Sequence, residues 1–321
     1  MRASKLLSSA TVAIVLLSAT GVAAKEELKS GNPWRGTEIG YEHGFSAHSL
    51  SKSADQSYNP YYVHTLTLQP QWHVGEYLAF RAKLAIEQEL SDADDTTYKN
   101  EVMLSDLNLE AVTPGVTEPF TGVRLGGGLR FVFPTSKVAQ ATTMRLAISP
   151  AISLSRKFPL LEGLVLGYGA RFNFAFHQYT TAQQDAPGIA SCSVDDIRCG
   201  TNLGRRNAWG QLMHGPNLSL SPLSGLGVDL SFFFVNSFLY GLSDGGQYLN
   251  DEKDVNVRRA QFFTGSVSYE ALDFLTVALS FATMYGELAL DGTYQTPFFN
   301  RYTQLSVGFS ISIDPLIGKF Q

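Results

Sequence analysis

The sequence predicts an all-β protein, an antiparallel transmembrane β-barrel of about twelve strands with short periplasmic turns and long extracellular loops. First, segments of about ten to sixteen residues alternate apolar side chains with small or polar ones, which places one kind on each face of a strand. Second, the spacers alternate between short and long, as in outer-membrane barrels. Third, the chain begins with a segment typical of a secretory signal.

The first residues have the parts of a signal peptide. Arg2 and Lys5 give a basic start, residues 6–20 are mostly apolar, and Ala23 and Ala24 are small residues suited to cleavage. A transmembrane helix would need about 18 consecutive apolar residues, and Ser and Thr interrupt this stretch. We therefore expect a signal peptide over 1–24, a short periplasmic leader over 25–36 and the barrel over 37–321.

The alternation defines the strands, and in the third of them Leu78 and Phe80 share one face while Arg81 and Lys83 share the other. A soluble β-sandwich also alternates. Long strands, a polar face rich in Gly, Ser and Ala, and aromatic residues at the strand ends favour the barrel. The predicted strands are 37–49, 61–74, 76–90, 102–112, 122–134, 143–158, 164–179, 208–220, 227–240, 257–270, 275–287 and 301–313.

The spacers orient the barrel, because short turns face the periplasm and long loops face outward in this class. An even number of strands then puts both termini in the periplasm. The short spacers are around Gly75 and at 113–121, 159–163, 221–226 and 271–274. The long spacers are 50–60, 91–101, 180–207, 241–256 and 288–300.

Three prolines, Pro70, Pro150 and Pro216, fall inside predicted strands. Proline has no N–H for the ladder, so each should mark a bulge or a break that blurs the strand register. A lateral opening in the wall at these prolines is the alternative.

The alternation also predicts which charged residues face the lumen. Arginines of the fifth to seventh strands would form a basic wall facing a more acidic one, and such opposed charges orient polar solutes. Alternatively, these groups pair into a salt-bridge network that fills the lumen. The predicted pore-lining residues are Arg81, Asp106, Glu110, Arg124, Arg130, Arg145 and Arg171.

Three other kinds of site can be assessed from the sequence, namely a disulfide, a cofactor or metal site and a nucleic-acid-binding surface. Cys192 and Cys199 lie close together in an exported chain, which favours a disulfide within a loop over a metal pair. No phosphate loop, dinucleotide fingerprint or zinc pattern occurs, so we expect no cofactor and no metal. Without Arg2 and Lys5 the formal charge goes from -5 to -7, and no basic stripe indicates nucleic acid as a partner.

We also expect no catalytic residues. A lipid-modifying enzyme would need Ser with His, or acids with His, at the outer rim, and only His43 and His64 are candidates there. Expected partners are outer-membrane lipids, lipopolysaccharide and a small-molecule solute. Acidic loop clusters such as the one at Asp92, Asp94 and Asp95 are interpreted first as solvated loop surface, and the alternative is that they hold calcium or link to lipopolysaccharide through divalent ions.

One stretch resembles a known family. Asp106-Leu107-Asn108-Leu109, followed by the glycine-rich strand Val123 to Arg130 and then Pro134-Thr135-Ser136, is similar to the transporter barrels of the phenol meta-pathway degradation family. There an Asp-Leu-x-Leu strand precedes a glycine-rich strand that ends in Pro-Thr-Gly; here Ser136 replaces the Gly. The resemblance implies a passive channel for small, aromatic or apolar solutes.

Together these observations predict a monomeric outer-membrane channel that passes a small solute by diffusion. Because the leader at 25–36 is short, active uptake is not expected. One alternative is a structural or adhesion barrel with a plugged lumen, which would act through its outer loops. The other is an outer-membrane lipid-modifying enzyme.

Overall fold

A computed structural model describes residues 32–47, 62–91, 100–182, 206–241, 255–286, 292–294, 296–300 and 302–318. The signal peptide predicted over 1–24 and the pair Cys192 and Cys199 lie outside these residues and stay predictions. The acidic loop residues Asp92, Asp94 and Asp95 also lie outside them.

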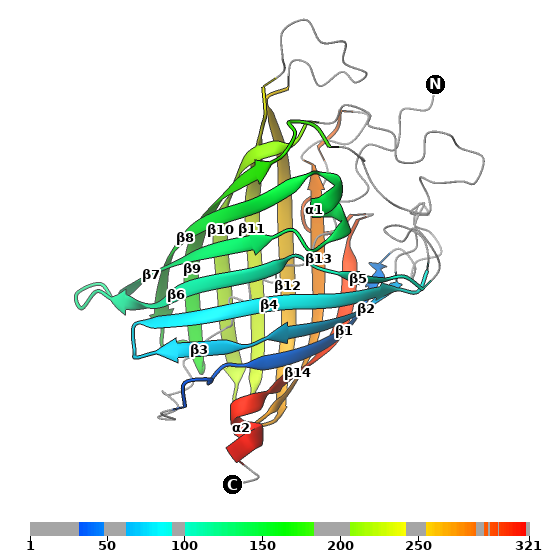
Figure 1. The fold of residues 1–321 in the computed structure, drawn as a ribbon. Coiled ribbons are helices and arrows are strands. Elements are labelled where there is room, and N and C mark those ends of the chain that lie inside the picture. Colours follow the sequence, from blue (N-terminus) through cyan, green and yellow to red (C-terminus); the bar gives the residue numbers. More distant parts are fainter. Residues whose placement is uncertain are drawn as a thin grey trace, which may run out of the picture.

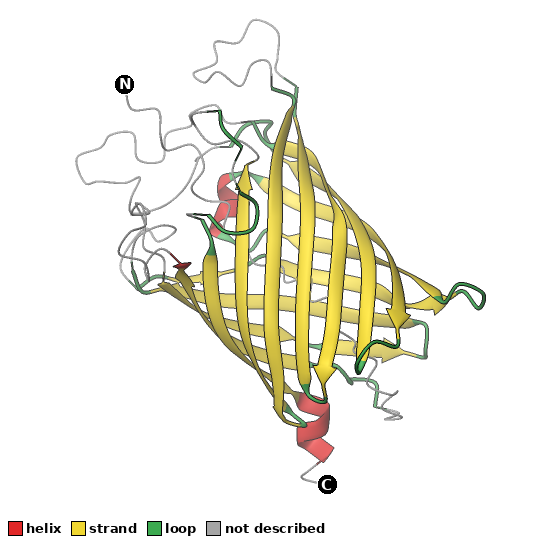
Figure 2. Cartoon of the chain, turned by 180° about the vertical axis from the view of Figure 1, so that it is seen from behind, coloured by secondary structure: helices red, strands yellow, loops and turns green. Residues whose placement is uncertain are grey.

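The described chain forms one closed antiparallel β-barrel of twelve strands, as predicted (Figures 1 and 2). Two of the twelve are each split in two, β2 with β3 and β5 with β6. The segments are β1 Glu38–Ser46, β2 Tyr62–Gln69, β3 Gln71–Val74, β4 Leu78–Glu89, β5 Val102–Leu104, β6 Leu107–Thr117, β7 Val123–Phe133, β8 Met144–Phe158, β9 Gly163–His177, β10 Ala208–Leu223, β11 Leu226–Leu239, β12 Val257–Leu272, β13 Leu275–Gly286 and β14 Gln304–Ser312.

Each strand pairs with its neighbours in the sequence, and the sheet closes on itself because β1 pairs with β14 while β2 and β3 pair with β4. Closure leaves no free sheet edge, which a barrel in lipid requires. Short turns join the strands at one end, here called the turn end. The long connections leave from the other, here called the loop end.

The prolines interrupt the ladder without breaking the wall. Pro70 separates β2 from β3, yet its carbonyl accepts a hydrogen bond of 3.0 Å from the Ala82 N–H of β4. Beside Pro150 and Pro216, two positions on one side are unpaired, and pairing resumes in the same register. The prediction of a break is therefore confirmed at Pro70, whereas register shifts at Pro150 and Pro216, and a lateral opening, are not observed.

The bulge that the prolines were expected to make lies elsewhere. The β6–β7 register shifts between Thr113 and Val116, where Gly115 has a φ of 93° that favours glycine. The strand continues past this bulge to Thr117, so the prediction that it ends at residue 112 was wrong. Pro114 lies within this bulge, where the two neighbouring residues of the ladder are out of register.

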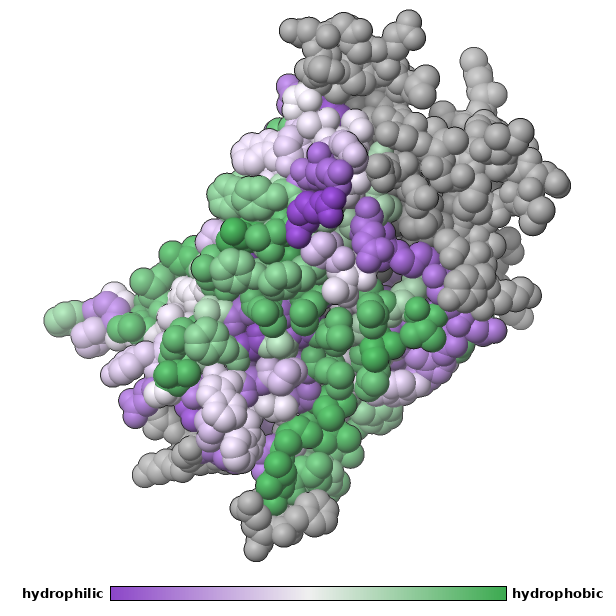
Figure 3. Space-filling model, in the orientation of Figure 1, coloured by the Kyte–Doolittle hydropathy of each residue, from purple (hydrophilic) through white to green (hydrophobic). Residues whose placement is uncertain are grey.

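The outer wall is apolar and the inner wall is mostly polar. Large exposed side chains such as Leu166, Phe174, Leu279 and Phe309 do not line the lumen cavity, and Figure 3 shows apolar side chains over much of the face it displays. An apolar exterior around a polar interior suits a barrel surrounded by lipid.

Two short helices accompany the barrel, α1 Lys137–Ala141 after β7 and α2 Ile313–Gly318 after β14. Neither of these described helices is long and apolar enough to cross a membrane.

Candidate functional site: the barrel lumen

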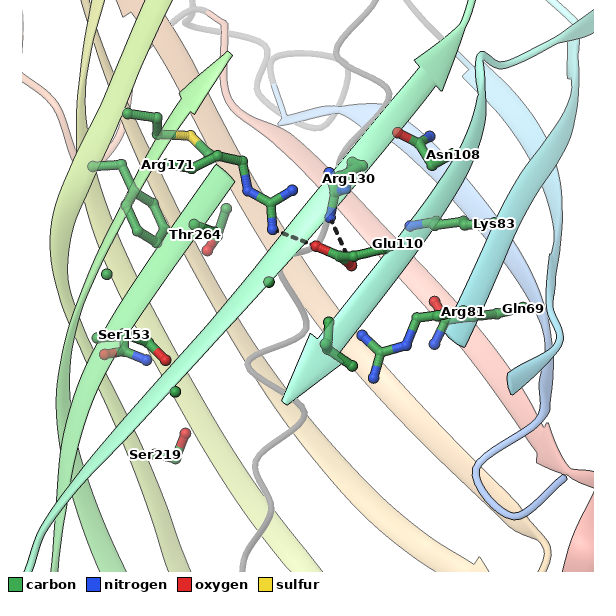
Figure 4. Close-up of a pocket in the computed structure, with 18 of the residues that line it drawn as sticks. Gln69, Arg81, Lys83, Asn108, Glu110, Arg130, Ser153, Arg171, Ser219 and Thr264 are labelled. Carbon is green, nitrogen blue, oxygen red and sulfur yellow. Dashed lines mark hydrogen bonds and ion pairs between the residues drawn. The ribbon is translucent and has the colours of Figure 1, made fainter. Parts of the chain in front are cut away.

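The lumen contains a cavity of about 730 Å³. Its lining includes Gly122 and Lys157 near the turn end and Gly44 and Gln304 near the loop end, so it runs along most of the barrel. Glycine, serine and alanine supply much of the inward face, which leaves space between the longer charged side chains (Figure 4).

Five of the seven predicted lumen residues line this cavity, and two do not. The five that line the cavity lie where the strands are regular and the alternation of faces is undisturbed. The five are Arg81, Glu110, Arg124, Arg130 and Arg171. The two that do not line it are Asp106 and Arg145.

The centre of the site is Glu110 of β6, which is held by two arginines. Arg171 Nη2 of β9 donates to Glu110 Oε1 at 2.7 Å, and Arg130 Nη2 of β7 donates to Glu110 Oε2 at 3.4 Å (Figure 4). The Glu110 side chain is only 7% exposed, and the side chains of Arg171 and Arg130 are 12% and 13% exposed. Charge-assisted hydrogen bonds in such a sheltered place are among the stronger ones in proteins.

Strand register builds this arrangement. Glu110 is directly opposite Arg81 on one side and Arg130 on the other, so the three lie in one cross-strand row. Side chains at such positions have Cβ atoms about 5 Å apart. Arg171 joins from β9, two strands beyond β7, and its long side chain reaches across the lumen surface.

Further charged residues line the cavity, and cations outnumber carboxylates six to three. Lys83 is one that the predicted list missed, although the alternation had put it on the polar face with Arg81. No hydrogen-bond acceptor contacts its ammonium group among the described residues, and Figure 4 shows it directed toward Glu110. The cations are Arg81, Lys83, Arg124, Arg130, Lys157 and Arg171, and the carboxylates are Glu42, Glu87 and Glu110.

All these charges come from the consecutive strands β1 to β9, which make up more than half of the barrel wall. We call the lining residues on β1 to β9 the charged arc and those on β10 to β14 the uncharged arc, because none of the latter carries a charge. The lining arginines other than Arg81 lie on β7 and β9, and the lining carboxylates lie on β1, β4 and β6, so the basic wall facing a more acidic one stays a prediction. Cations and carboxylates share neighbouring strands, where the register pairs them directly.

An apolar cluster that sequence reasoning missed lies on the same strands as the uncharged arc, and Met213 and Phe233 belong to both. Phe233, Val235 and Phe262 are each at most 6% exposed, and Met213 packs against them. The rings of Phe233 and Phe262 stack with centroids 6.5 Å apart. The run from Phe232 to Val235 is apolar on both faces, so alternation could not show that one face turns inward.

Asp106 supports the wall rather than the lumen. It lies in the gap between β5 and β6, and its Oδ1 accepts the Ser136 N–H at 3.0 Å. Thr135 Oγ1 likewise donates to the Ser105 carbonyl at 2.6 Å and accepts the Leu107 N–H at 2.9 Å. The residues that carry the family resemblance thus hold two neighbouring strands together at the loop end.

Arg145 does not line the cavity because the strand is irregular there. The β8–β9 register shifts between Met144 and Leu146, and the extra residue on β8 is Arg145. Its guanidinium is exposed and donates to the Gln178 side chain beyond the end of β9. Alternation assigns faces only as far as the register is regular.

The histidines considered for catalysis lie on the outer wall. His43 and His64 are direct cross-strand neighbours on β1 and β2, with ring centroids 4.5 Å apart. Tyr62 and Tyr41 hydrogen-bond to their Nδ1 atoms at 2.9 and 2.6 Å, respectively. Within the described part of the chain, no serine or carboxylate hydrogen-bonds to either ring.

A closed barrel with an apolar exterior and a polar, partly open lumen defines the class of protein. It is a porin-like outer-membrane β-barrel. No protein-family model matches the chain, and no curated protein matches it either. The resemblance to the phenol meta-pathway degradation family therefore depends on its motif residues.

Several solved structures are similar to this chain at low identity. The KdgM porin is 9% identical with a TM-score of 0.44, and the NanC porin is 10% identical with a TM-score of 0.45. Each alignment covers 86% of this chain and 98% of the porin. The transport unit of the autotransporter AIDA-I from Escherichia coli is 10% identical with a TM-score of 0.42, over 89% of this chain and 92% of that one.

Proposed function

We propose that the protein is a monomeric outer-membrane channel through which a small solute diffuses passively. The observation that carries the proposal is the cavity, which is lined by residues from both ends of the strands. The small side chains that face the lumen leave room for a solute, and the charged side chains provide polar contacts as it crosses the lumen. The signal peptide at 1–24 and the disulfide between Cys192 and Cys199 belong to the same proposal.

The direct test is single-channel recording of refolded protein in a planar lipid bilayer. The proposal predicts steady unitary currents that are proportional to salt concentration. Protein that inserts, as shown by protection from added protease, but gives no current over many insertions would contradict it.

A plugged barrel is the second candidate, and one observation favours it. Arg130 and Arg171 converge on Glu110 inside the lumen, which narrows the passage at that height. In that case the function would lie in the outer loops, through adhesion or contact with lipopolysaccharide. Silent insertions, together with loss of cell-surface binding after deletion of residues 183–205, would support this candidate.

The motif resemblance suggests aromatic or apolar molecules as one class of solute. Adding phenol to one side of a conducting channel tests it, because a solute that enters the lumen interrupts the salt current. An unchanged current at saturating phenol would remove this class.

A further inference from the structure

We propose that the lumen selects small organic anions that combine one carboxylate with an apolar body, such as benzoate. The proposal rests on the channel function proposed above and names its substrate class. The geometry that points to it is the boundary between the two arcs. There a cluster of cations meets the apolar cluster on adjacent strands.

The first part of the argument is the excess of positive charge around Glu110. Arg81 and Arg130 flank it in the cross-strand row, and Arg171 donates to it from β9. Lys83, two residues from Arg81 on the same face of β4, adds a fourth cation. Glu42 and Glu87 interact electrostatically with Lys83, so the local excess lies at Arg130 and Arg171, which share the single carboxylate of Glu110 and can attract a second one.

The second part is the surplus of hydrogen-bond donors. Each guanidinium group has five N–H donors, so Arg130 and Arg171 together offer ten. Glu110 accepts one hydrogen bond from each arginine. Arg130 Nε and both Nε and Nη1 of Arg171 are buried without an acceptor among the described residues. Buried donors without acceptors are costly, so an arriving carboxylate that supplies oxygens through a small rotation of these side chains is stabilised.

The third part is the apolar surface beside these donors. Met213 of β10 is the direct cross-strand partner of Arg171 of β9, and Met213 in turn pairs with Val235 of β11. Met213 and Phe233 both line the cavity. Cross-strand partners have Cβ atoms about 5 Å apart, which is close to the length of one aromatic ring. A carboxylate at Arg171 can therefore rest its apolar body on Met213 and Phe233.

The three parts favour a specific combination of charge and apolar surface. A carboxylate without an apolar body, such as acetate, gains only the arginine contacts. A ring without charge, such as benzyl alcohol, gains only the apolar contacts and leaves the donors unsatisfied. Benzoate gains both, and each part is worth about tenfold in affinity.

The experiment compares these three probes as blockers of the chloride current in a planar bilayer. We expect benzoate to interrupt the current with a dwell time about tenfold longer than acetate, and benzyl alcohol to give no resolved interruptions. The double variant R130A/R171A should conduct but lose the benzoate interruptions. M213S should reduce benzoate to the acetate level, whereas M144S, at a methionine that does not line the cavity, should behave like the unmodified chain.

Equal dwell times for acetate and benzoate, or unchanged benzoate block in R130A/R171A, would overturn the inference while leaving the channel proposal intact. If the protein inserts but stays silent, the channel proposal fails, and equilibrium dialysis of radiolabelled benzoate against refolded protein decides the inference instead. Saturable binding that disappears in R130A/R171A would support a benzoate-class site in a closed barrel. Absence of binding would overturn it.

Discussion

The charged arc on β1 to β9 and the uncharged arc on β10 to β14 share the same alternation and the same kinds of small residue, yet they fill the lumen differently. On the charged arc, long side chains are fixed by ion pairs that cross strands, as at Glu110 with Arg130 and Arg171. On the strands of the uncharged arc, Phe233 and Phe262 stack without polar partners. The difference shows that one barrel wall can carry both an electrostatic and an apolar surface, each with its own sensitivity to mutation.

The largest effect is expected at the centre of the charged arc. Glu110→Gln leaves two sheltered guanidinium groups without their carboxylate, and we expect the free energy of unfolding to fall by about 3 kcal/mol. Urea unfolding in lipid vesicles, followed by tryptophan fluorescence, measures it. The matched control is Glu162→Gln in the exposed turn between β8 and β9, which should change stability by less than about 0.5 kcal/mol. Equal stability of the two variants would remove the ion pairs as the organising feature of this arc.

On the uncharged arc, truncating Phe233 to Ala should lower the free energy of unfolding by about 2–3 kcal/mol, because it opens a cavity in the apolar cluster. The same urea titration applies. Phe120→Ala is the control, since Phe120 is 95% exposed in the β6–β7 turn. A loss at Phe233 no larger than at Phe120 would mean that the apolar cluster does not stabilise the barrel.

The boundary between the arcs can be probed with two glycines that face each other. A Cβ on Gly215 of β10 would lie 1.9 Å from the Phe232 carbonyl oxygen, whereas a Cβ on its partner Gly169 of β9 would meet nothing within 4 Å. Gly215→Ala should therefore cost about 1–2 kcal/mol by forcing β10 and β11 apart, and Gly169→Ala should be nearly neutral. Folded and unfolded barrels migrate differently in gel electrophoresis. The temperature at which the folded band is lost measures the stability of each variant. The same change in unfolding temperature for both variants would contradict the close approach of β10 to β11 at Gly215.

The smallest effect lies outside both arcs, in the turn at Glu118. This carboxylate accepts hydrogen bonds from the N–H and hydroxyl groups of Thr121 and from the Phe120 N–H, which lower its pKa. A pKa lowered by folding gives stability that is present above the ordinary carboxyl pKa and is lost as the pH falls through the lowered value.

Glu118→Gln should therefore be slightly less stable than the unmodified chain at about pH 7 and equal to it at about pH 2. The urea concentration at the midpoint of unfolding, measured for both proteins at each pH, gives the difference in stability between them. A gap between the two proteins that persists unchanged at acid pH would show that the ionised carboxylate is not what stabilises the turn.

The alternation was sufficient to predict the twelve strands. Arg130 and Arg171, which it put on the polar face of regular segments, line the cavity. It failed at Arg145, because an extra residue in one strand shifts the phase without changing the pattern of apolar residues. The stretch from residue 113 was assigned to a short spacer, although β6 continues through the bulge to Thr117.

The contents of the lumen were less predictable than its wall. Which charges meet depends on the shear of neighbouring strands, so the row formed by Arg81, Glu110 and Arg130 could not be read from one strand at a time. The inward position of Phe233 was hidden, since residues on both sides of it are apolar too.

The central claim is that the charged arc controls an open lumen, and the zero-current potential in a KCl gradient tests it most directly. With an about tenfold gradient, the six cations against three carboxylates predict a potential of the sign for chloride preference in the unmodified chain. In R130A/R171A the zero-current potential should shift toward the sign that indicates potassium preference. A potassium-selective unmodified channel, or an identical potential in the double variant, would contradict the account.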